Sequence, residues 1–488
     1  MIVRINRRPR KKRIVILGGG FGGVYAALEL EKLLAGRNSV EICLVSRDNF
    51  FLFTPMLHEI AASDLEITNI VNPLRKLLRR VEVVVGDVNE LDLPNKRVLI
   101  SRCYQERLRQ LDYDHLVIAL GSVTNFYDLP GLADLAIPMK TLPDAIRLRA
   151  QVLNRLEAAN AEINSLVRLP LLTFVVAGGG FAGVETVAAL NDFIREALPF
   201  YPNLREEMCR VVLVTSGPII LPELGHDLGE YTKNVLAGRG VEIHLNSHVR
   251  SVTQNSVTLG DGTSISSRTL VWTAGIVPSP LIASIPSSKE RGRLVVNQFL
   301  QLPDWPNVWA IGDCAFVPDI RNKGESHPPT AQHAMREGKI VAQNIVAALS
   351  GRSLRAFSFK TIGLLASIGR RMGVARIFGF NFSGFFAWWM WRTVYLSKLP
   401  GLDKKVRVAF DWTLDLLFPK DVCAVYNLDR DPDYHRPEHV WTVLDHEDSE
   451  ITNPQSGNGQ LKFSTSELSS MVRRTPSGLP KRERGCGD

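Results

Sequence analysis

Two short glycine-rich stretches hold the residues of this sequence whose types and spacing could do chemistry. An apolar run at 13–17 leads into Gly18, Gly20 and Gly23, and a near copy at 172–177 leads into glycines at 178, 180 and 183. In a strand–turn–helix unit, the first glycine of such a triplet permits a tight turn, the second lets the backbone approach a pyrophosphate, and the third lets helix and strand pack closely. One triplet is a weak signal. Two copies 160 residues apart predict two dinucleotide sites in one chain.

A further polar group follows the strand predicted over residues 307–311. Gly312 and Asp313 end that strand. Asp313 could present its carboxylate to a ribose or polyol hydroxyl, because ligands of doubly wound folds bind at the carboxyl ends of the strands. Alternatively, it is a simple turn residue. Two prolines then precede a predicted helix with Thr330 as the expected N-cap, and a ligand at this sheet edge would meet the positive end of that helix.

These residues need strands and helices in alternation, and the hydrophobic pattern predicts them. The predicted strands cover residues 13–17, 40–45, 81–88, 112–122, 172–177, 210–216, 241–245, 257–265 and 270–274. Asp261 and Gly262 predict a turn within 257–265. The predicted helices cover 22–35, 71–80, 143–160, 182–197 and 225–239, and an aromatic-rich loop is expected at 50–59. The alternation predicts an α/β fold of doubly wound sheets.

Composition excludes several classes of protein. With 488 residues, 45% of them apolar and 22% charged, the chain can bury large cores and is neither disordered nor fibrous. Its six cysteines, at 43, 103, 209, 314, 423 and 486, form no C-x-x-C pair and no metal-ligand spacing, so neither a metal site nor a redox disulfide is predicted.

The N-terminus is basic: seven of the first thirteen residues are Lys or Arg, in a chain of net charge +8. This stretch is either a solvated tail or a contact with anionic lipid. It does not indicate nucleic-acid binding, because no aromatic residues are interleaved with the charges. No apolar segment with a cleavage site follows it, so we expect the protein to stay in the cytosol.

Two stretches near the C-terminus indicate contact with a membrane surface. Residues 377–391 are rich in Phe and Trp, but only these 15 separate Arg376 from Arg392, whereas a spanning helix needs about 20. They suit an interfacial anchor. Residues 404–418 predict an amphipathic helix with Val406, Phe410, Leu414 and Leu417 on one face. Alternatively, both helices pack onto the globular body or onto a second subunit. Beyond about residue 445 the composition predicts disorder.

Six motifs in a fixed order carry a family resemblance. They are Gly-Gly-Gly-Phe-Gly-Gly at 18–23, Phe-Leu-Phe-Thr-Pro-Met-Leu at 51–57, Gly-Gly-Gly-Phe-Ala-Gly-Val-Glu at 178–185, Trp-Thr-Ala-Gly at 272–275, Ala-Ile-Gly-Asp at 310–313 and Pro-Pro-Thr-Ala-Gln-His-Ala at 328–334. With them, about residues 13–420 resemble the type II NADH dehydrogenases, which are non-proton-pumping NADH:quinone oxidoreductases. The segments at 366–370 and 382–389 resemble the membrane-associating C-terminal part of that family.

The resemblance implies a non-covalent FAD on the first glycine turn and NADH on the second. The implied organisation is a basic tail at 1–12, a discontinuous FAD-binding domain at 13–135 and 276–350, an NAD(P)H-binding domain at 136–275, a membrane-association and dimerisation region at 351–442, and a disordered tail at 443–488. The residues implied in cofactor binding are Gly18, Gly20, Gly23, Ser46, Arg47, Thr54, Pro55, Val88, Gly121, Gly178, Gly180, Gly183, Thr215, Gly275, Gly312, Asp313 and Ala331.

The implied reaction passes a hydride from nicotinamide to flavin and then two electrons to a quinone that arrives from the lipid. Glu185 would lie beside the two rings, to position the nicotinamide or relay a proton, or else it is a carboxylate that stabilises the helix N-terminus. Gln332 matches the quinone-site helix of the family, whereas Arg336 replaces its second glutamine. The implied location is peripheral, on the cytoplasmic face of the cell membrane, with a homodimer as the expected assembly.

Two positions weaken the cofactor assignment. Ser46 and Thr215 stand where acidic residues usually bond a ribose, and without a charge at 215 NADPH is not excluded. Two alternatives remain. One is a related flavoprotein, such as a sulfide:quinone oxidoreductase or a disulfide reductase, although both need cysteine pairs that this sequence lacks. The other is a catalytically silent, nucleotide-sensing flavoprotein tethered to a membrane.

Overall fold

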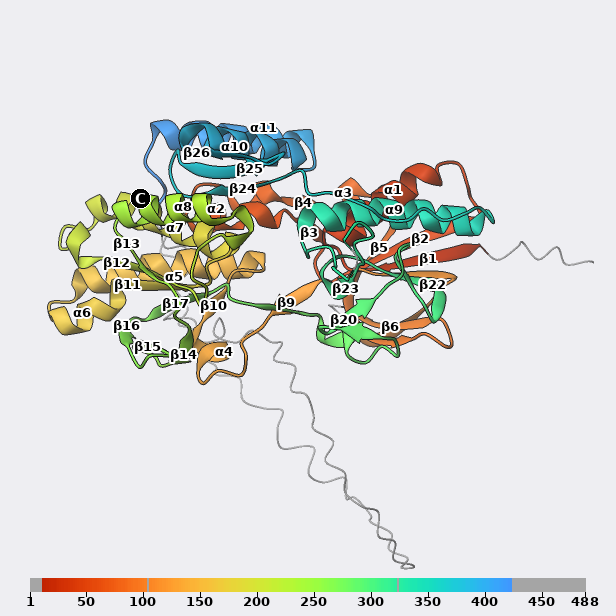
Figure 1. The fold of residues 1–488 in the computed structure, drawn as a ribbon, viewed down its shortest axis with the longest axis horizontal. Helices are drawn as coiled ribbons and strands as arrows, with labels where there is room; N and C mark the ends of the chain where they lie inside the picture. Colours follow the sequence, from red (N-terminus) through yellow and green to blue (C-terminus); the bar gives the residue numbers. More distant parts are fainter. Residues whose placement is uncertain (1–10, 103–104, 323, 424–488) are drawn as a thin grey trace, which may run out of the picture. The chain divides into compact units, whose positions relative to one another are not determined.

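The computed structural model describes residues 11–102, 105–322 and 324–423. The expectations for residues 1–10, for Cys103 and Cys486, and for everything from residue 424 onward lie outside these ranges. Within them, Figure 1 shows strands and helices in alternation, and the predicted α/β fold of doubly wound sheets is confirmed.

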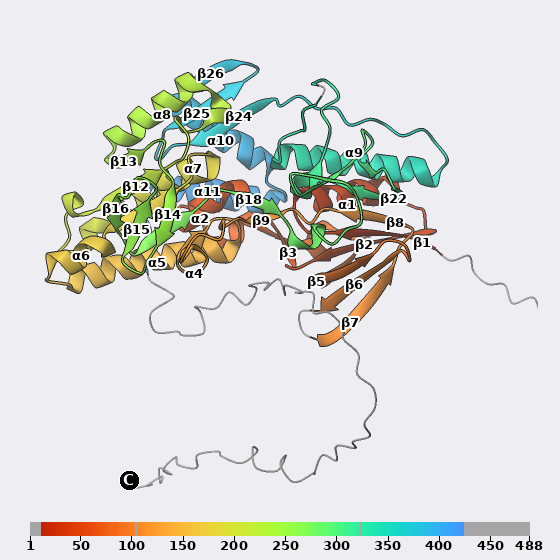
Figure 2. The same cartoon turned by 60° about the horizontal axis from the view of Figure 1, so that its bottom comes forward.

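The first glycine turn belongs to an eight-stranded sheet of order β21-β22-β8-β1-β2-β5-β6-β7. Its strands are β1 (Lys12–Leu17), β2 (Val40–Ser46), β5 (Glu82–Asp92), β6 (Arg97–Arg102), β7 (Gln105–Asp112), β8 (His115–Ile118), β21 (Gln301–Leu302) and β22 (Trp305–Ala310). The five strands from β22 to β5 run parallel. At one edge, β5, β6 and β7 form the antiparallel ribbon seen in Figure 2.

Two helices far apart in sequence cover one face of this sheet. α1 (Phe21–Leu33) follows the first glycine turn and α9 (Ala331–Leu349) follows the prolines, and they lie side by side in Figure 1. The two helices can approach closely because Gly338 has no side chain. A Cβ at this position would stand only 2.5 Å from the carbonyl oxygen of Gly22. The segment after residue 300 therefore completes the fold that begins at β1.

The chain leaves and re-enters this sheet through two paired strands. β9 (Ser122–Thr124) leads out and β18 (Ile276–Pro278) returns antiparallel to it. Smaller elements follow the return: β19 (Lys289–Glu290), β20 (Arg293–Val295) and β23 (Ala315–Phe316) form a three-stranded sheet. Near the first turn, β3 (Phe50–Leu52) pairs with β4 (Val71–Pro73), and α2 (Leu57–Ala61) and α3 (Leu74–Leu77) follow these strands.

Residues between the two linker strands form a second, wholly parallel sheet of order β10-β17-β11-β12-β13. Its strands are β10 (Ile137–Pro138), β11 (Thr173–Ala177), β12 (Arg210–Val214), β13 (Val241–His244) and β17 (Thr269–Trp272). Successive side chains of a strand point to opposite faces. Accordingly, Phe174 and Val176 join the core that holds α5 (Leu142–Ala161), α7 (Phe181–Ala197) and α8 (His226–Gly238).

The opposite face of the second sheet is covered by β14 (Val249–Val252), β15 (Ser256–Leu259) and β16 (Ser264–Ser266), which pack against Val175 and Val212. The short helices α4 (Leu132–Leu135) and α6 (Ser165–Leu171) flank this sheet. α5 begins with a capping box in which Thr141 and Asp144 satisfy each other's backbone N–H groups. The segment predicted over 257–265, with a turn at Asp261 and Gly262, forms the antiparallel hairpin of β15 and β16, as expected.

The C-terminal region is helical only in part. β24 (Gly363–Ser367), β25 (Gly373–Ile377) and β26 (Phe380–Ser383) form an antiparallel sheet, and α10 (Gly384–Lys398) and α11 (Leu402–Leu417) follow it. The aromatic stretch 377–391, expected to be one anchor, is divided between β26 and α10. Positive φ angles at Phe378 and Gly379 make the turn between β25 and β26, which separates the first of its aromatic residues from the helix.

The helix predicted over 71–80 is wrong. Val71, Asn72 and Pro73 pair with Phe50–Leu52, and only the four residues of α3 are helical. A residue before proline avoids the α region, which favours extended backbone at Asn72. The segment 50–59, expected to be a loop, contains β3, a single 3-10 turn at Thr54–Met56 and most of α2.

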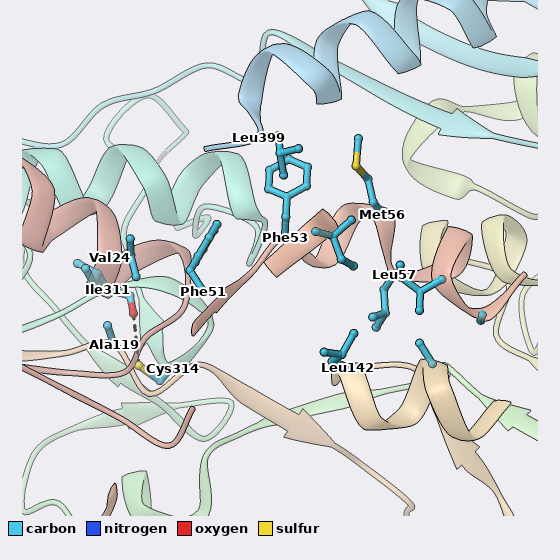
Figure 3. Close-up of a cluster of buried hydrophobic side chains, with 14 of the residues drawn as sticks. Val24, Phe51, Phe53, Met56, Leu57, Ala119, Leu142, Ile311, Cys314 and Leu399 are labelled. Carbon is cyan, nitrogen blue, oxygen red and sulfur yellow. Dashed lines mark hydrogen bonds between the residues drawn. The ribbon is translucent and has the colours of Figure 1, made fainter. Parts of the chain in front are cut away.

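One hydrophobic core joins these parts. Figure 3 draws side chains of this core, among them Phe51 and Phe53, Leu57 of α2, Leu142 at the start of α5, and Leu399 after α10. All five side chains are nearly inaccessible to solvent. The C-terminal region is therefore packed onto the same core as the two sheets.

Candidate functional site

The two glycine turns have matching geometry. Gly18 and Gly178 have φ angles of +112° and +124°, which other residues rarely adopt. A Cβ on Gly23 would stand 1.9 Å from the carbonyl oxygen of Gly18, and a Cβ on Gly183 would stand 1.8 Å from that of Gly178. Each helix thus packs directly onto its own turn.

The middle glycine of each triplet faces open space. A Cβ on Gly20 or Gly180 would meet no atom within 4 Å. Both are the N-cap residues of the following helices, α1 and α7, and neither cap carries a side-chain hydrogen bond. The free backbone N–H groups and the positive helix end can receive the phosphates of a dinucleotide.

The residues after the second strand of each unit are buried hydroxyls. Ser46 ends β2 and lies against Gly19, and Thr215 follows β12 and lies against Gly179. The Thr215 hydroxyl accepts a hydrogen bond from the Gly217 N–H (3.4 Å). Beside Ser46, the exposed Arg47 is paired with Asp87 (Nε to Oδ1, 2.9 Å). Neither strand end carries a carboxylate of its own for a ribose.

Asp313 is held by two polar side chains from the linker region. Its Oδ2 accepts a hydrogen bond from the Ser122 hydroxyl (2.6 Å), and Lys140 Nζ lies 2.7 Å from Ser122 Oγ and 3.5 Å from Asp313 Oδ2. Gly121 and Gly312 stand beside this cluster with φ angles of +66° and +72°. The carboxylate is fixed and charge-balanced, yet partly open to solvent, as a hydroxyl-binding group should be.

Other predicted cofactor positions line the same sheet edge or its neighbourhood. Thr54 and Pro55 form the 3-10 turn between β3 and α2, and Val88 lies half-buried on β5. Ala331 is the first residue of α9. The start of this helix contacts Gly312, since a Cβ built on Gly312 would stand 3.7 Å from the Cβ of Ala334.

On the second sheet, Gly275 is covered by the side chain of Tyr127. The Tyr127 hydroxyl would lie 2.5 Å from a Cβ at Gly275, and its ring packs edge-on to Trp272. Tyr127 itself has a positive φ of 52°. The sequence had not singled out this tyrosine.

Glu185 is the fifth residue of α7, beyond its first turn, and it is not a solvated helix-end carboxylate. Its Oε1 accepts hydrogen bonds from the Trp391 indole N–H (3.0 Å) and the Ser367 N–H (3.1 Å), and its Oε2 is 3.8 Å from His58 Nδ1. Burial raises the pKa of Glu185 to about 8 and lowers the pKa of His58 to about 3. At neutral pH this is a pair of uncharged groups beneath the C-terminal region.

The quinone-site prediction concerns the start of α9. The Arg336 guanidinium lies 3.9 Å from the ring centroid of Phe359, and its Nη1 donates to the carbonyl oxygen of Gln332 (2.8 Å). The Gln332 side chain reaches the carbonyl oxygen of Gly363. Arg336 is thus folded back along its own helix. Thr330 is the N-cap residue as predicted, but its hydroxyl bonds His333 Nδ1 (2.7 Å) instead of capping the helix.

Sequence reasoning missed several buried polar residues around these positions. They are His58, Glu59, Glu337, Trp391 and Trp412, together with the partly buried Lys140 and Phe359. Glu59 accepts from the Trp412 indole N–H (3.1 Å), and burial raises its pKa to about 8. The indole partners of Glu59 and Glu185 lie 353 and 206 residues away along the chain, so no local pattern marks these pairs.

Family models match almost the whole described chain. A model described as pyridine nucleotide-disulphide oxidoreductase matches residues 12–338, and one for an NDH2 C-terminal domain matches residues 362–421. The type II NADH:quinone oxidoreductase Ndh of Mycobacterium tuberculosis is 33% identical over 84% of this chain and 89% of its own length. This chain belongs to the type II NADH:quinone oxidoreductases.

Two further relatives agree with this family. The demethylphylloquinone reductase NdbB of Synechocystis is 32% identical over 82% of this chain and 96% of its own length. The structure of NDH2 from Plasmodium falciparum in complex with NADH has the same fold, with a TM-score of 0.79 over 85% of this chain and all of that one, at 22% identity. The family predicted from the motifs is confirmed.

The C-terminal region of the family bears an uncovered apolar face here. On α11, Leu402, Val406, Phe410 and Leu417 are more than half exposed, whereas Val408 and Trp412 point inward and are buried. On β26 and α10, the side chains of Phe380, Phe385, Phe386 and Trp389 are also exposed. Among the described helices, none combines the length and apolarity needed to cross a bilayer.

Proposed function

We propose that this chain transfers a hydride from NADH to a non-covalent FAD and then two electrons to a membrane quinone, without pumping protons. The observation that carries the proposal is the pair of matching glycine turns, in which a Cβ on Gly20 or Gly180 would meet no atom within 4 Å. The assignment rests also on membership of the family. FAD would occupy residues 13–135 and 276–350, and NADH would occupy 136–275.

The chain's residues fit FAD on the first sheet. Gly18, Gly20 and Gly23 offer a pyrophosphate cradle, and the partly open Asp313, fixed by Ser122 and Lys140, offers an acceptor for ribityl hydroxyls. Ser46, Arg47, Thr54, Pro55, Val88, Gly121, Gly312 and Ala331 are the further residues that we assign to this site. When bound, the flavin supplies the two-electron chemistry.

On the second sheet we assign Gly178, Gly180, Gly183, Thr215 and Gly275 to NADH. Their part is to hold the nicotinamide in a fixed orientation, since positioning is what the protein contributes to hydride transfer. Thr215 would bond a ribose hydroxyl without placing a negative charge there. This residue would therefore not repel the 2′-phosphate of NADPH, and NADPH is not excluded as a donor beside NADH.

We assign proton handling and acceptor binding to Glu185, Gln332 and Arg336. Glu185 is uncharged at neutral pH and sits where α7 meets β24 and α10, so it can hold a proton between the two sheets and the C-terminal region. Gln332 and Arg336 offer hydrogen bonds to a quinone carbonyl, once Arg336 swings away from Phe359.

The acceptor would reach the site from a membrane on which α10 and α11 lie. The exposed apolar residues of α11 have cationic neighbours, Lys398 and Arg407, that suit the anionic lipid surface of a cytoplasmic leaflet. We assign the protein to the cytoplasmic face of the cell membrane as a peripheral homodimer. The same apolar face would serve the lipid or the second subunit.

Cysteine chemistry of the sulfide:quinone oxidoreductase kind finds little support. Cys314 is the described cysteine next to Asp313, and it is fully buried, with its Sγ donating to the carbonyl oxygen of Ile311 (3.3 Å). Burial raises the pKa of its thiol to about 12, far from the thiolate that such chemistry needs.

An anaerobic titration tests the proposal. The purified protein should be yellow, NADH should bleach it, and a soluble quinone should restore the colour. Failure to bleach with either NADH or NADPH would refute the dehydrogenase, and bleaching without reoxidation by any quinone would refute the acceptor. Whether FAD is covalent is checked by its release on acid precipitation.

A further inference from the structure

A buried carboxyl group, Glu337, lies directly behind the turn that carries Asp313. Its Oε2 accepts a hydrogen bond from the Gly312 N–H (2.7 Å), and its side chain is only 3% exposed. It stands on α9 two helical turns from the N-terminal end that we assign to the flavin. Nothing in the reaction described above uses it.

Glu337 opens onto a narrow crevice between α9 and the segment that follows Asp313. The crevice is lined by Gly312, Ala315, Val317, His327, His333 and Glu337. His327 is nearly buried, and its Nε2 has no hydrogen-bond partner among the described residues, with Asp319 Oδ1 3.9 Å away. Buried polar atoms rarely lack partners, so this unpaired imidazole nitrogen is an exception. The crevice itself leaves no space for a water molecule.

Five charged or titratable groups lie around Glu337, on its own helix and on the segments that pack against it. They are Asp313 on the turn, His327 before α9, His333 and Arg336 on α9, and Tyr25 on α1. Burial lowers the pKa of both histidines, that of His333 to about 4, and the guanidinium of Arg336 is turned toward Phe359. Burial also raises the pKa of Tyr25, so that its hydroxyl stays neutral. Among the described residues, no cation lowers the pKa of Glu337.

Burial raises the pKa of Glu337 to about 7; the Gly312 N–H lowers it, and the negative charge of Asp313 raises it. At neutral pH the group is therefore poised between its two forms. A new negative charge nearby acts strongly on such a group, because the surroundings screen it poorly. Reduction of a flavin by hydride adds one negative charge to this site.

We propose that Glu337 takes up a proton from solvent when the bound flavin is reduced and gives it up when the electrons leave. The hydride brings two electrons and one proton to the flavin, and the carboxylate binds the second proton. When the two electrons pass to the quinone, one proton leaves the flavin and one leaves Glu337, which gives the quinol. The sum is NADH, quinone and one proton giving NAD⁺ and quinol.

This inference rests on the flavin site proposed above, and a redox titration tests it apart from turnover. For a two-electron couple, each tenfold change in equilibrium constant is about 30 mV. Uptake of one proton gives a midpoint potential that falls by about 30 mV per pH unit, and uptake of two gives about 59 mV. We expect the steeper slope in the wild-type holoprotein between about pH 7 and 8.5.

Glu337→Gln keeps an acceptor for the Gly312 N–H but cannot titrate. In this variant the midpoint potential of the flavin should therefore fall by only about 30 mV per pH unit. Glu29→Gln is the matched control, since Glu29 lies on α1 and bonds Gln343 further along α9. It should keep the wild-type slope. A slope of about 30 mV in the wild type, or an unchanged steep slope in Glu337→Gln, would overturn the proposal.

If Glu337→Gln does not retain flavin, infrared difference spectra of the wild type decide the matter. Reduction should produce the C=O band of one newly protonated carboxyl group, and its absence would overturn the inference. A protein that binds no flavin, or whose flavin NADH does not reduce, would instead refute the proposed function. The two failures are therefore distinguishable.

Discussion

The uncharged state of Glu185 predicts an unusual effect of its substitution by glutamine. Glutamine mimics the protonated acid: its carbonyl oxygen can accept from Trp391 and Ser367, and its amide can donate to His58. We expect Glu185→Gln to stabilise the protein at alkaline pH, where the wild type must either ionise a buried acid or hold a proton that the solvent no longer favours.

The magnitude follows from proton linkage. The pKa of Glu185 is about 8 in the folded chain and about 4.3 in an unfolded one. Because the folded pKa is the higher one, the contribution of this group to stability is full below about pH 4.3 and is lost as the pH rises to about 8. The whole loss is roughly 5 kcal/mol, of which roughly 3 kcal/mol falls between about pH 5.5 and 8.5.

Glutamine at 185 escapes this loss, so the gap in melting temperature between variant and wild type should widen with pH. At about 2 cal/mol/K per residue, unfolding a unit of roughly 400 residues has an entropy of about 0.8 kcal/mol/K. The gap should therefore grow by about 3 to 4 °C from pH 5.5 to 8.5. The assay is a thermal melt of the holoprotein followed by flavin fluorescence.

Glu207→Gln is the matched control because Glu207 is exposed. The difference in melting temperature between this variant and the wild type should not change with pH. An equal gap at both pH values for Glu185→Gln would refute the reasoning, since it would mean that Glu185 does not change its protonation on folding. A variant that melts lower at pH 8.5 would refute it as well. It would show that the carboxylate form is the one that Trp391 and Ser367 stabilise.

Three further outcomes follow from the site. Gly20→Val should leave the fold intact but abolish the yellow colour, whereas Gly180→Val should stay yellow and resist bleaching by NADH. A Cβ at either position meets no protein atom within 4 Å, so the new side chain only blocks the phosphates. Absorbance spectra check both variants. Thr215→Glu should lower kcat/KM for NADPH relative to NADH by about tenfold or more, through repulsion of the 2′-phosphate; an unchanged ratio would contradict the assignment of this residue. Phe410→Glu should reduce co-sedimentation with anionic vesicles without altering the oxidation of NADH by a soluble quinone; a parallel loss of both would indicate a folding defect instead.

Features encoded within a few residues could be predicted from the sequence. The glycine turns, the strands that lead into them and the N-cap position of Thr330 depend on local sterics and short-range hydrogen bonds. The helix predicted over 71–80 failed because pairing of β4 with β3, together with Pro73, overrides a weak helical pattern.

The surroundings of Glu185 and Glu59 could not be predicted in this way. Their indole partners, Trp391 and Trp412, follow them by 206 and 353 residues. No local pattern marks a glutamate that will be buried, because its type alone favours the surface. Only the packing of the C-terminal region onto α2 and α7 creates these sites.

The orientation of α11 illustrates the same limit. The sequence predicted an amphipathic helix with Val406, Phe410 and Leu417 on one face, but it left open whether that face meets a membrane surface, the globular body or a second subunit. The structure turns it outward, because the opposite face is fixed by polar contacts: Asp411 bonds Asn69, and Lys404 bonds the carbonyl oxygen of Thr68. Trp412 fills the remaining space against Glu59. A helix held by its polar side leaves its apolar side uncovered among the described residues, and the membrane contact proposed above requires such a surface.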